Sequence, residues 1–464
     1  MRYLLLLCAV LALCSSAGAA ATSPPPVDPA ADTVNRIFTE ALAHGHAYDQ
    51  LRDLTTLHPG RLAGSQSLED AVTWAAHVLG DMGLTRVYLQ DAMVPHWERG
   101  APESVQLLDG TRSVPLAATA LGNSAATSEA GLTASVIEVH SLAEIAHLGR
   151  AGVAGKIVFF NRPMDPTLFS TMSAYGGAGD QRNQGPGVAA QFGAVAALSR
   201  SLTLAHDNVP HTGNSTFPPG VAAIPAAALS TNAADRLSAA LHANPAVRVQ
   251  LAIHARTLPD ALSHNVIGEI RGSEFPNEII LVGGHLDSWD IAPGAHDDGA
   301  GVVQSIEVLR IFHALGLKPR HTLRCVLFVN EENGRGGSTT YVTAAKSAPE
   351  RHVFAVETDN GGFAPTGFNV GSSQDLMIHQ RAARWRPLFE PWGVWSFTRG
   401  AGGADITGLM LQGVPVAGLT PDSQRYFDYH HSVTDSIDKV NPRELHLGAD
   451  ALASLIWLVD TQGL

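Results

Sequence analysis

Five short apolar runs alternate with helix-like segments from His264 to the C-terminus of this 464-residue chain. The runs are NVIGEI, EIILVGG, TLRCVLFV, HVFAVET and VPVAGL. Between two of them, Val302, Ile306 and Leu309 have the spacing of one face of a helix. Alternating strands and helices build a largely parallel sheet with helices on both faces, so we expect a doubly wound α/β fold. In such folds, ligands bind beyond the carboxyl ends of the strands.

An earlier part of the chain fits the same pattern. The stretch SLEDAVTWAAHVLGDMG predicts a helix that Ser67 caps and Gly83 ends, and TRVYLQDAMV predicts a strand after it. From about residue 103 to 256, short Ala- and Gly-rich strands alternate with small helices and interrupt the pattern. We therefore expect one domain in two parts, residues 22–102 and 257–464, with an inserted domain at 103–256.

The first 21 residues have the features of an export signal. One arginine precedes Tyr3–Leu13, an apolar run that is too short to span a bilayer, and small residues suited to cleavage follow at Ala19–Ala21. A lipoprotein anchor at Cys14 is the alternative, but the leucine before it is bulkier than a lipobox requires. We expect a cleaved signal peptide, a periplasmic or secreted protein, and no membrane span later in the chain.

The net charge argues against nucleic-acid binding, and the cysteine content argues against an intrachain disulfide. The formal net charge is −13, so the chain lacks the basic footprint of a nucleic-acid-binding protein. Removal of the signal would leave Cys325 as the single cysteine, which excludes an intrachain disulfide. Cys325 lies in the apolar run TLRCVLFV, and we expect it to be buried as a small hydrophobic residue.

Polar clusters follow the predicted strands at the point where each strand ends. Because these ends meet at one edge of a parallel sheet, we expect the clusters to form a single site. The residues concerned are His285, Asp287, Asp297, Asp298, Glu331, Glu332, Asp359 and His431.

The predicted site consists of histidine and carboxylate without thiolate. This set of donors suits zinc, manganese or cobalt in an open catalytic site rather than a closed structural site. Two histidines and three acidic ligands exceed the needs of one catalytic zinc. A pair of metals that shares an aspartate would explain the surplus, and it would explain why the carboxylates tolerate one another.

The motifs around these residues resemble those of a known family. GGHLDS, GAHDDGAG, NEENGRGGS, ETDNGG and YHHSVTDS are similar to the signature of the co-catalytic zinc exopeptidases, which include bacterial leucyl aminopeptidases and glutamate carboxypeptidases. The likeness extends to GRLAGSQSLE, VPHWERG, RNQGPGVAA and PHTGN, and it is greatest to the carboxypeptidase Q branch. It covers nearly the whole chain after the signal.

The resemblance implies two zinc ions per chain, with manganese or cobalt as substitutes. One zinc would be bound by His285 and Asp359 and the other by Glu332 and His431, with Asp297 shared between them.

The resemblance also implies roles around the metals. Glu331 would be the general base, and Asp287 would orient His285. The peptide bond between Asp297 and Asp298 would be cis. His431 lies four residues before Asp435, which is the family spacing for the last ligand.

One position departs from the family. Relatives often carry a tyrosine just before the last histidine ligand, where it donates to the oxyanion. This chain has His430 there, and we expect His430 to act as the donor.

The function implied is hydrolysis of dipeptides or short peptides with unblocked termini, by a carboxypeptidase or dipeptidase. An aminopeptidase of the same family is the alternative. A glutaminyl cyclase-like enzyme with one zinc and a catalytically silent receptor are more distant alternatives. A phosphoesterase would require Arg or Lys near the metals, and we expect none close to the ligand motifs.

Residues 103–256 resemble a protease-associated-type domain that would cover the site. Arg182 and His211 lie in its shared motifs, and we expect them to contact substrate or a second copy of the chain. Arg182 is the predicted partner of a substrate carboxylate. A homodimer remains open.

Overall fold

The central strands are buried on both faces. In the computed structural model, which describes residues 28–464, Ile280 and Val282 face one hydrophobic core and Leu281 faces another. This period of two is typical of a strand inside a sheet that is covered on both sides. The strands form an eight-stranded sheet in the order β1-β10-β12-β11-β13-β16-β14-β15. Their bounds are β1 Arg86–Glu98, β10 Arg256–Ile270, β11 Phe275–His285, β12 His321–Phe328, β13 Arg351–Glu357, β14 Pro365–Gly371, β15 Ser396–Arg399 and β16 Val416–Pro421.

The centre of this sheet is parallel and its flanks are mixed. Strands β12, β11, β13 and β16 run parallel to one another, and β14 is parallel to β15. The pairs β1–β10, β10–β12 and β14–β16 are antiparallel. The predicted α/β class is confirmed, and the parallel part is the part whose strands lead into the predicted site residues.

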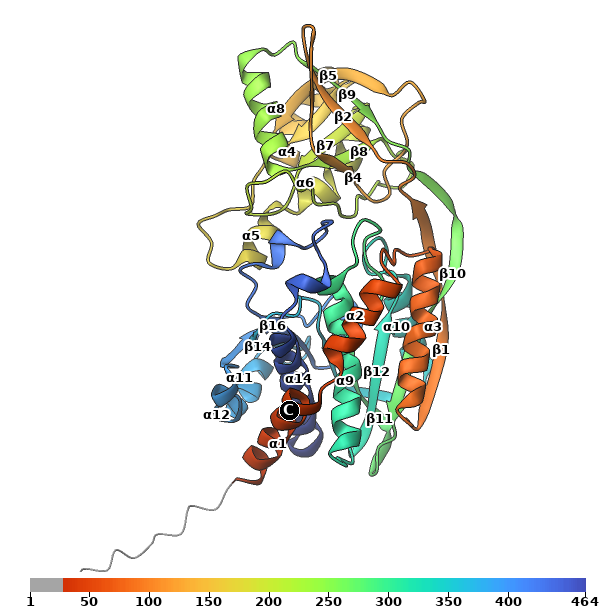
Figure 1. Ribbon diagram of the computed structural model, residues 1–464, viewed down its shortest axis with the longest axis vertical. Coiled ribbons are helices and arrows are strands. Elements are labelled where there is room, and N and C mark those ends of the chain that lie inside the picture. The colour runs from red at the N-terminus through yellow and green to blue at the C-terminus, as the bar shows by residue number, and fades with distance from the viewer. Residues whose placement is uncertain (1–27) are drawn as a thin grey trace, which may run out of the picture.

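Helices cover both faces of the sheet (Figure 1). One core contains helices α1, α2, α3, α9 and α14, and the core on the other face contains α10 and α13. Their bounds are α1 Pro29–His44, α2 Ala47–Leu57, α3 Gln66–Asp81, α9 Ala300–Ala314, α10 Gly336–Ser347, α13 Thr407–Leu411 and α14 Pro442–Gln462. We call this sheet with its helices the large unit.

Helix α3 begins two residues earlier than the sequence predicted. Ser65 is the N-cap, and its hydroxyl oxygen accepts from the Leu68 N–H at 3.2 Å. The Ser67 hydroxyl instead donates to the Pro59 carbonyl at 2.7 Å. The predicted cap at Ser67 is therefore wrong, because Ser65 already accepts from the N–H group that an N-cap residue binds.

Residues 104–252 form a second sheet, which we call the small unit. Its strand order is β3-β2-β9-β5-β6-β7-β8-β4. The strand bounds are β2 Ser104–Asp109, β3 Arg112–Pro115, β4 Ala118–Ala120, β5 Leu132–Val139, β6 Ile157–Phe160, β7 Ala196–Arg200, β8 Ala226–Leu229 and β9 Arg248–Ala252. Its helices are α4 Leu142–Val153, α5 Thr171–Ala178, α6 Asp180–Asn183, α7 Gly185–Gln191 and α8 Thr231–Ala243.

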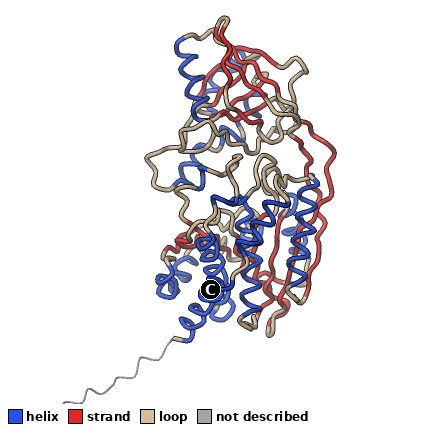
Figure 2. The backbone as a smooth tube through the Cα atoms, viewed as in Figure 1, coloured by secondary structure: helices blue, strands red, loops and turns tan. Residues whose placement is uncertain are grey.

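Two long strands connect the units. The chain enters the small unit after β1 and returns to the large unit along β10, and these strands pair antiparallel from Arg86 to Glu98. Figure 2 shows this ribbon of two strands rising along one side of the molecule. The segment after β16 rises from the large unit toward α5 (Figure 1), where Phe427 stacks on Tyr175. The remaining short elements are η1 Ala295–Gly299, α11 Ile378–Ala382, η2 Ala383–Trp385, α12 Arg386–Phe389, η3 Glu390–Trp392, η4 Tyr426–Asp428 and η5 Ile437–Lys439.

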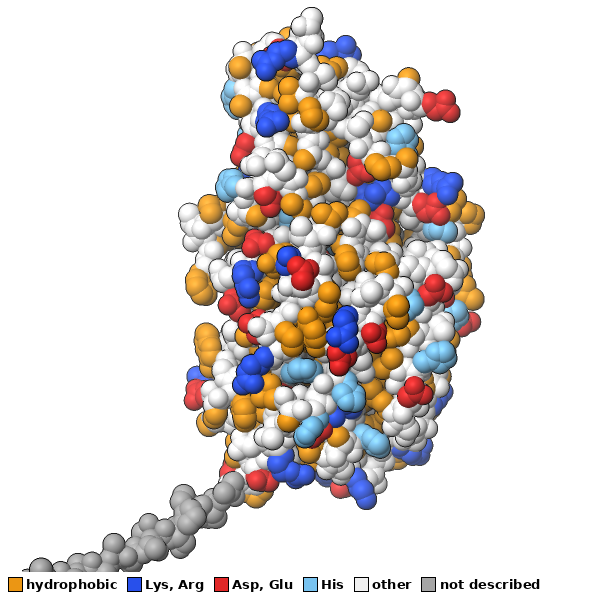
Figure 3. All heavy atoms as spheres, in the orientation of Figure 1, with side chains coloured by type: hydrophobic (Ala, Val, Ile, Leu, Met, Phe, Trp, Pro, Cys, Tyr) orange, Lys and Arg blue, Asp and Glu red, His pale blue; other side chains and the backbone are white. Residues whose placement is uncertain are grey.

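The remaining predictions concern Cys325, membrane spans, surface charge and the signal peptide. Cys325 is fully buried, as expected, and it is a free cysteine among the described residues. Among the described residues, none of the helices has the length and apolar character needed to cross a membrane. Basic side chains are scattered among acidic and apolar ones over the face shown in Figure 3. The predicted signal peptide lies outside the described residues.

Candidate metal centre

The four parallel central strands lead to a single cavity of about 470 Å³ between the two units. Strand β11 ends at His285, the loop after β12 carries Glu331 and Glu332, and Asp359 follows β13. Asp297 comes from η1, just before helix α9. The cavity is lined by most of the predicted site residues, namely Asp297, Glu331, Glu332, Asp359, His430 and His431.

His285 faces two of the carboxylates from below the cavity. Its Nε2 lies 3.4 Å from Asp297 Oδ1 and 3.4 Å from Asp359 Oδ1. Its other ring nitrogen, Nδ1, lies 3.0 Å from the main-chain carbonyl of Asp287 and donates to it. The imidazole is therefore held with Nε2 directed at the carboxylate pair, and these three residues form one group of potential metal ligands.

His431 makes the matching arrangement on the other side of Asp297. Its Nε2 lies 3.2 Å from Asp297 Oδ2 and 3.1 Å from Glu332 Oε2. The Asp297 carboxylate thus presents Oδ1 to His285 and Oδ2 to His431. One carboxylate between two histidine–carboxylate pairs is the arrangement that two metals sharing a ligand would need.

The carboxylates attract positive charge to this site. Burial lowers the pKa of His285, but Asp359, Asp287 and Asp297 outweigh burial and raise that pKa well above its usual value. Burial likewise opposes a raised pKa at His431, and Glu332 and Asp297 raise it to about 10. The carboxylates therefore favour positive charge at both histidines, and a buried site of this kind is suited to bind a divalent cation.

Unsatisfied polar atoms also fit a metal. Among the described residues, His285 Nε2, Asp297 Oδ2 and Glu332 Oε1 are buried without a hydrogen-bond partner. Buried polar atoms normally have one, so these atoms are available to a ligand. Nitrogen and oxygen donors without sulfur suit zinc, manganese or cobalt.

Two neighbouring aspartates hold the main chain. Asp298 accepts from the N–H groups of His285 and Gly301, each at 3.0 Å. Asp435 accepts from the N–H groups of His296 at 2.7 Å and Asp297 at 3.0 Å. The Asp297–Asp298 peptide bond is cis, as the family resemblance implied. These carboxylates fix the segments that carry His285 and Asp297.

Asp287 contacts both His285 and the turn that carries Glu331 and Glu332. Its carboxylate accepts from the N–H groups of Glu331 at 3.0 Å and Glu332 at 3.2 Å. Its contact with His285 is closest through the main-chain carbonyl, while the carboxylate lies 3.6 Å from that ring. The side chain of Asp287 therefore fixes the turn with the two glutamates more directly than it fixes the histidine.

Glu331 is the more exposed of the two glutamates in this turn, both of which line the cavity. It is partly exposed, whereas Glu332 is buried beside His431. Burial raises the pKa of the Glu331 carboxyl well above its usual value, although the nearby His285 opposes the rise. A carboxyl with an elevated pKa at the edge of the cavity is suited to accept a proton.

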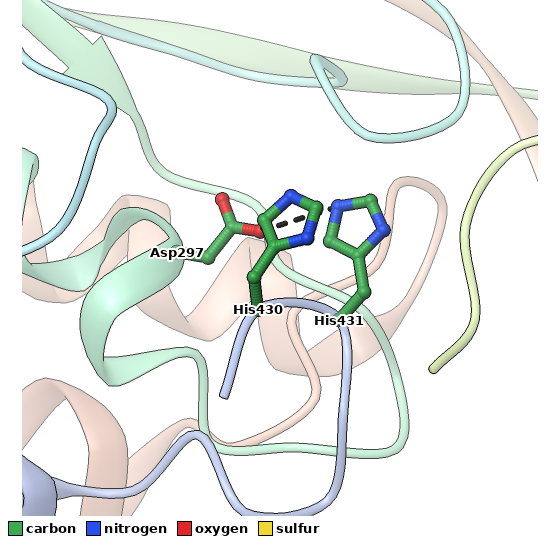
Figure 4. Close-up of side chains that lie close together, drawn as sticks. All are labelled: Asp297, His430 and His431. Atoms are coloured by element: carbon green, nitrogen blue, oxygen red, sulfur yellow. Dashed lines mark ion pairs between the residues drawn. The ribbon is translucent and has the colours of Figure 1, made fainter. Parts of the chain in front are cut away.

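His430 stacks on His431. The ring centroids are 3.6 Å apart with an angle of 16° between the planes, and Figure 4 shows both rings beside the Asp297 carboxylate. His430 Nε2 lies 3.5 Å from Asp297 Oδ2, a longer distance than that of His431. Burial and the charge of His431 lower the pKa of His430 well below its usual value. These effects favour the neutral form of His430, which also belongs, with Asp297 and His431, to a second group of potential metal ligands.

Sequence reasoning assigned no role to Arg61, which the structure makes a central support. Arg61 is fully buried, and its guanidinium donates to the carbonyls of Leu286, Pro293 and Gly294 at 2.8, 2.6 and 3.1 Å. These carbonyls belong to the loop that joins His285 to Asp297. The only signal in the sequence was the position of Arg61 in the shared motif GRLAGSQSLE.

The expectation that no Arg or Lys lies close to the ligand motifs is wrong. Arg335 and Arg182 both line the cavity. Arg335 is exposed and has a φ of 140°, and the Asn330 side-chain oxygen holds this turn by accepting from Arg335 N–H at 3.0 Å. The arginine stands three residues after Glu332, within the quoted motif NEENGRGGS, so the sequence did contain the signal.

Comparisons with known proteins show which family the chain belongs to. The model of peptidase family M28 matches residues 265–456. Carboxypeptidase Q of Bos taurus is 35% identical over 418 residues, which cover 90% of this chain and 86% of the relative. The crystal structure of a peptidase M28 precursor from Shewanella amazonensis SB2B has a TM-score of 0.88 at 33% identity, covering 94% of this chain and 97% of that chain.

A more distant structure shares the fold. A zinc aminopeptidase from Bacillus subtilis has a TM-score of 0.65 at 20% identity and covers 90% of this chain and 95% of that chain. The relation to carboxypeptidase Q extends over most of both chains at more than one third identity. The chain therefore belongs to peptidase family M28 and is a metallopeptidase.

Proposed function

We propose that the protein is an exopeptidase with two zinc ions. His285 and Asp359 would hold one zinc, Glu332 and His431 would hold the other, and Asp297 would be shared. The position of Asp297, with one oxygen toward each histidine, is the observation that carries this proposal.

Zinc in such a site polarises a carbonyl and lowers the pKa of bound water toward neutrality. The residues of the chain then supply positioning and proton transfer. Glu331 would accept the proton of the attacking water and return it to the leaving amine. Asp287 would keep Glu331 in place through the main-chain N–H that it binds at 3.0 Å. His430, whose neutral form is favoured by burial and by the charge of His431, would donate to the oxyanion of the substrate.

The proposed substrates are dipeptides or short peptides with free termini. The similarity to carboxypeptidase Q supports a carboxypeptidase or dipeptidase, and the small unit above the cavity supports a limit on peptide length. Carboxylates at the metal centre attract a free amine. Arg182 and Arg335 both line the cavity and are available for a free carboxylate.

Arg182 is the proposed carboxylate partner. Its side chain is buried at the cavity wall, where Nη2 donates to the Tyr175 hydroxyl and Nη1 to the Thr212 carbonyl at 3.3 Å. Its Nε is buried with no partner among the described residues. A buried guanidinium without a counter-ion favours an anionic group of the substrate.

We expect blocking of either terminus to impair cleavage. Acetylating the amine or amidating the carboxylate of a good dipeptide should each lower kcat/KM roughly 10- to 100-fold, the range expected when a hydrogen bond to a charged group is lost. In Arg182→Gln, the penalty for amidation should disappear, whereas the exposed Arg386→Gln should keep it. Steady-state kinetics on free, acetylated and amidated peptides measure both effects.

Three results would change the proposal. Persistence of the amidation penalty in Arg182→Gln and its loss in Arg335→Gln would move the carboxylate contact to Arg335. A penalty for acetylation alone would indicate an aminopeptidase. Equal turnover of long or N-blocked peptides and free dipeptides would exclude the dipeptidase and favour a broader aminopeptidase or an endopeptidase.

We also propose two features of the whole chain. Residues 103–256 would be a protease-associated-type domain inserted between the two parts of the catalytic domain, in keeping with the separate sheet at residues 104–252. The protein would be exported, in keeping with the signal-like sequence of residues 1–21.

A further inference from the structure

We propose that residues 211–212 of the small unit are part of the metal centre, with His211 as a positioning residue that keeps His431 in its ligating orientation. This inference rests on the proposed function, because it takes His431 as a ligand. It adds that the small unit does more than cover the cavity.

Thr212 contacts His431 at two points. The Thr212 N–H donates to the His431 carbonyl at 2.8 Å, and the His431 Nδ1 lies 3.3 Å from the Thr212 carbonyl. Since Nε2 of His431 faces Asp297 and Glu332, Nδ1 is the nitrogen left for an orienting contact. Arg182 Nη1 lies 3.4 Å from this Nδ1 and donates to the same Thr212 carbonyl, so the carbonyl is the acceptor that the two donors share. Metal-bound histidines usually donate their second ring N–H to such an acceptor, which sets the tautomer and the ring direction.

His211 binds the main chain of His430, the residue before His431. Its Nδ1 lies 2.7 Å from the His430 carbonyl and donates to it. The His211 side chain is 1% exposed, and its main-chain N–H donates to the Ser201 hydroxyl at 2.9 Å. The carbonyls of both His430 and His431 are therefore bound by consecutive residues of the small unit.

The backbone of His431 explains why it needs this support. Its φ is 61°, in the left-handed region that residues with a side chain rarely adopt. Such a conformation persists only where the surroundings hold it in place. The two hydrogen bonds from residues 211–212 fall on the carbonyls on either side of this strained position.

Residues 211–212 are in turn fixed to the small unit and to the large unit. The Thr212 hydroxyl donates to the Ala120 carbonyl at 2.7 Å, and Arg99 donates to the same carbonyl at 2.6 Å. Arg99 also forms a two-point ion pair with Asp290, at 2.8 and 2.7 Å, in the loop that follows His285. From the same loop, Trp289 packs into the core of the small unit. The support of His431 is thus continuous with the segment that carries the other histidine.

The test is a zinc-affinity measurement on purified variants of the full chain. In His211→Leu, the apparent affinity for one of the two zinc ions should fall about 10- to 100-fold, the usual cost of losing an outer partner of a ligand. His211→Asn retains an N–H donor and should restore the affinity to within a few-fold of wild type. Titration against a chelator of known affinity, followed by elemental analysis, gives both affinities without an activity assay.

Thr127→Val is the matched control. It removes a pair of hydrogen bonds to Ile253 in the same unit, at 3.3 and 3.2 Å, that do not involve the metal centre. Both zinc affinities should be unchanged in this variant even if its Tm falls. A loss of zinc from Thr127→Val equal to that from His211→Leu would overturn the inference, because it would show a general effect of stability.

The remaining outcomes separate this inference from the proposed function. Wild-type affinity for both zinc ions in folded His211→Leu would overturn the inference alone. If His211→Leu does not fold, Ser201→Ala decides, since it keeps the His211 imidazole and removes the hydroxyl that accepts from the His211 N–H and donates to the Leu229 carbonyl. The same zinc should then bind more weakly, and unchanged affinities would overturn the inference. A wild-type protein that binds only one zinc would instead overturn the proposed function.

Discussion

Replacing Glu331 by glutamine is expected to lower kcat by about 10²- to 10⁴-fold, the usual contribution of a general acid–base group. Glutamine has nearly the same shape but cannot accept the proton of the attacking water. The main-chain N–H of residue 331 would still donate to Asp287, so the turn and its neighbour Glu332 should stay in place. The measurement is kcat at saturating dipeptide together with the metal content of the same sample.

The control for this variant is Glu390→Gln, an exposed glutamate outside the cavity, which should have the wild-type kcat. A kcat within tenfold of wild type in metal-replete Glu331→Gln would contradict the role of Glu331 as the base. Loss of metal from this variant would also contradict it, because Glu331 and Glu332 would then have exchanged roles.

Replacing His431 by alanine is expected to deplete one of the two metals. The variant removes the imidazole whose Nε2 lies 3.2 Å from Asp297 and 3.1 Å from Glu332. We expect the affinity of that site to fall by more than about 100-fold, since even the loss of an outer partner costs about 10- to 100-fold. Elemental analysis after dialysis against buffer of low zinc content measures the loss.

The adjacent histidine provides the matched comparison. His430→Ala should keep both metals and lower kcat by about 10²- to 10³-fold, the usual effect of removing an oxyanion donor. His430 lies 3.5 Å from one Asp297 oxygen and stacks on His431, so the two residues share an environment but differ in their contact with Glu332. If His430→Ala is the metal-poor variant, the assignment of the last ligand to His431 is wrong.

The part of the fold that carries the site was predictable because its signals are local. EIILVGG and TLRCVLFV are continuous apolar runs with polar residues directly after them, and they became the buried strands β11 and β12. A parallel sheet brings the carboxyl ends of such strands together, so residues as distant as His285 and Asp359 were expected to meet. In the structure, His285 Nε2 lies 3.4 Å from Asp359 Oδ1.

Weaker signals were missed. The strands Pro365–Gly371 and Ser396–Arg399 were not predicted, because their short sequences, PTGFNVG and SFTR, lack a long apolar run. Both strands form through pairing with segments that are far apart in the sequence: β14 pairs with β16, and β15 pairs with β14. Tertiary contacts of this kind override local preference.

The supports of the site were the least predictable part. Arg61 lies 225 residues from the Leu286 carbonyl that it binds, and His211 lies 219 residues from the His430 carbonyl. In both cases a side chain satisfies a main-chain carbonyl, and no pattern of residue types identifies that partner in advance. These contacts follow from the packing of the two units and are visible only in three dimensions.

Elemental analysis of the purified, fully active protein tests the two-metal centre most directly. We expect about two zinc ions per chain, and removal of both by a strong chelator should abolish peptidase activity. One metal per chain in fully active protein would contradict the shared role of Asp297. It would favour the alternative function of a one-zinc, glutaminyl cyclase-like enzyme. A folded protein without metal and without activity would instead favour a receptor built on this fold.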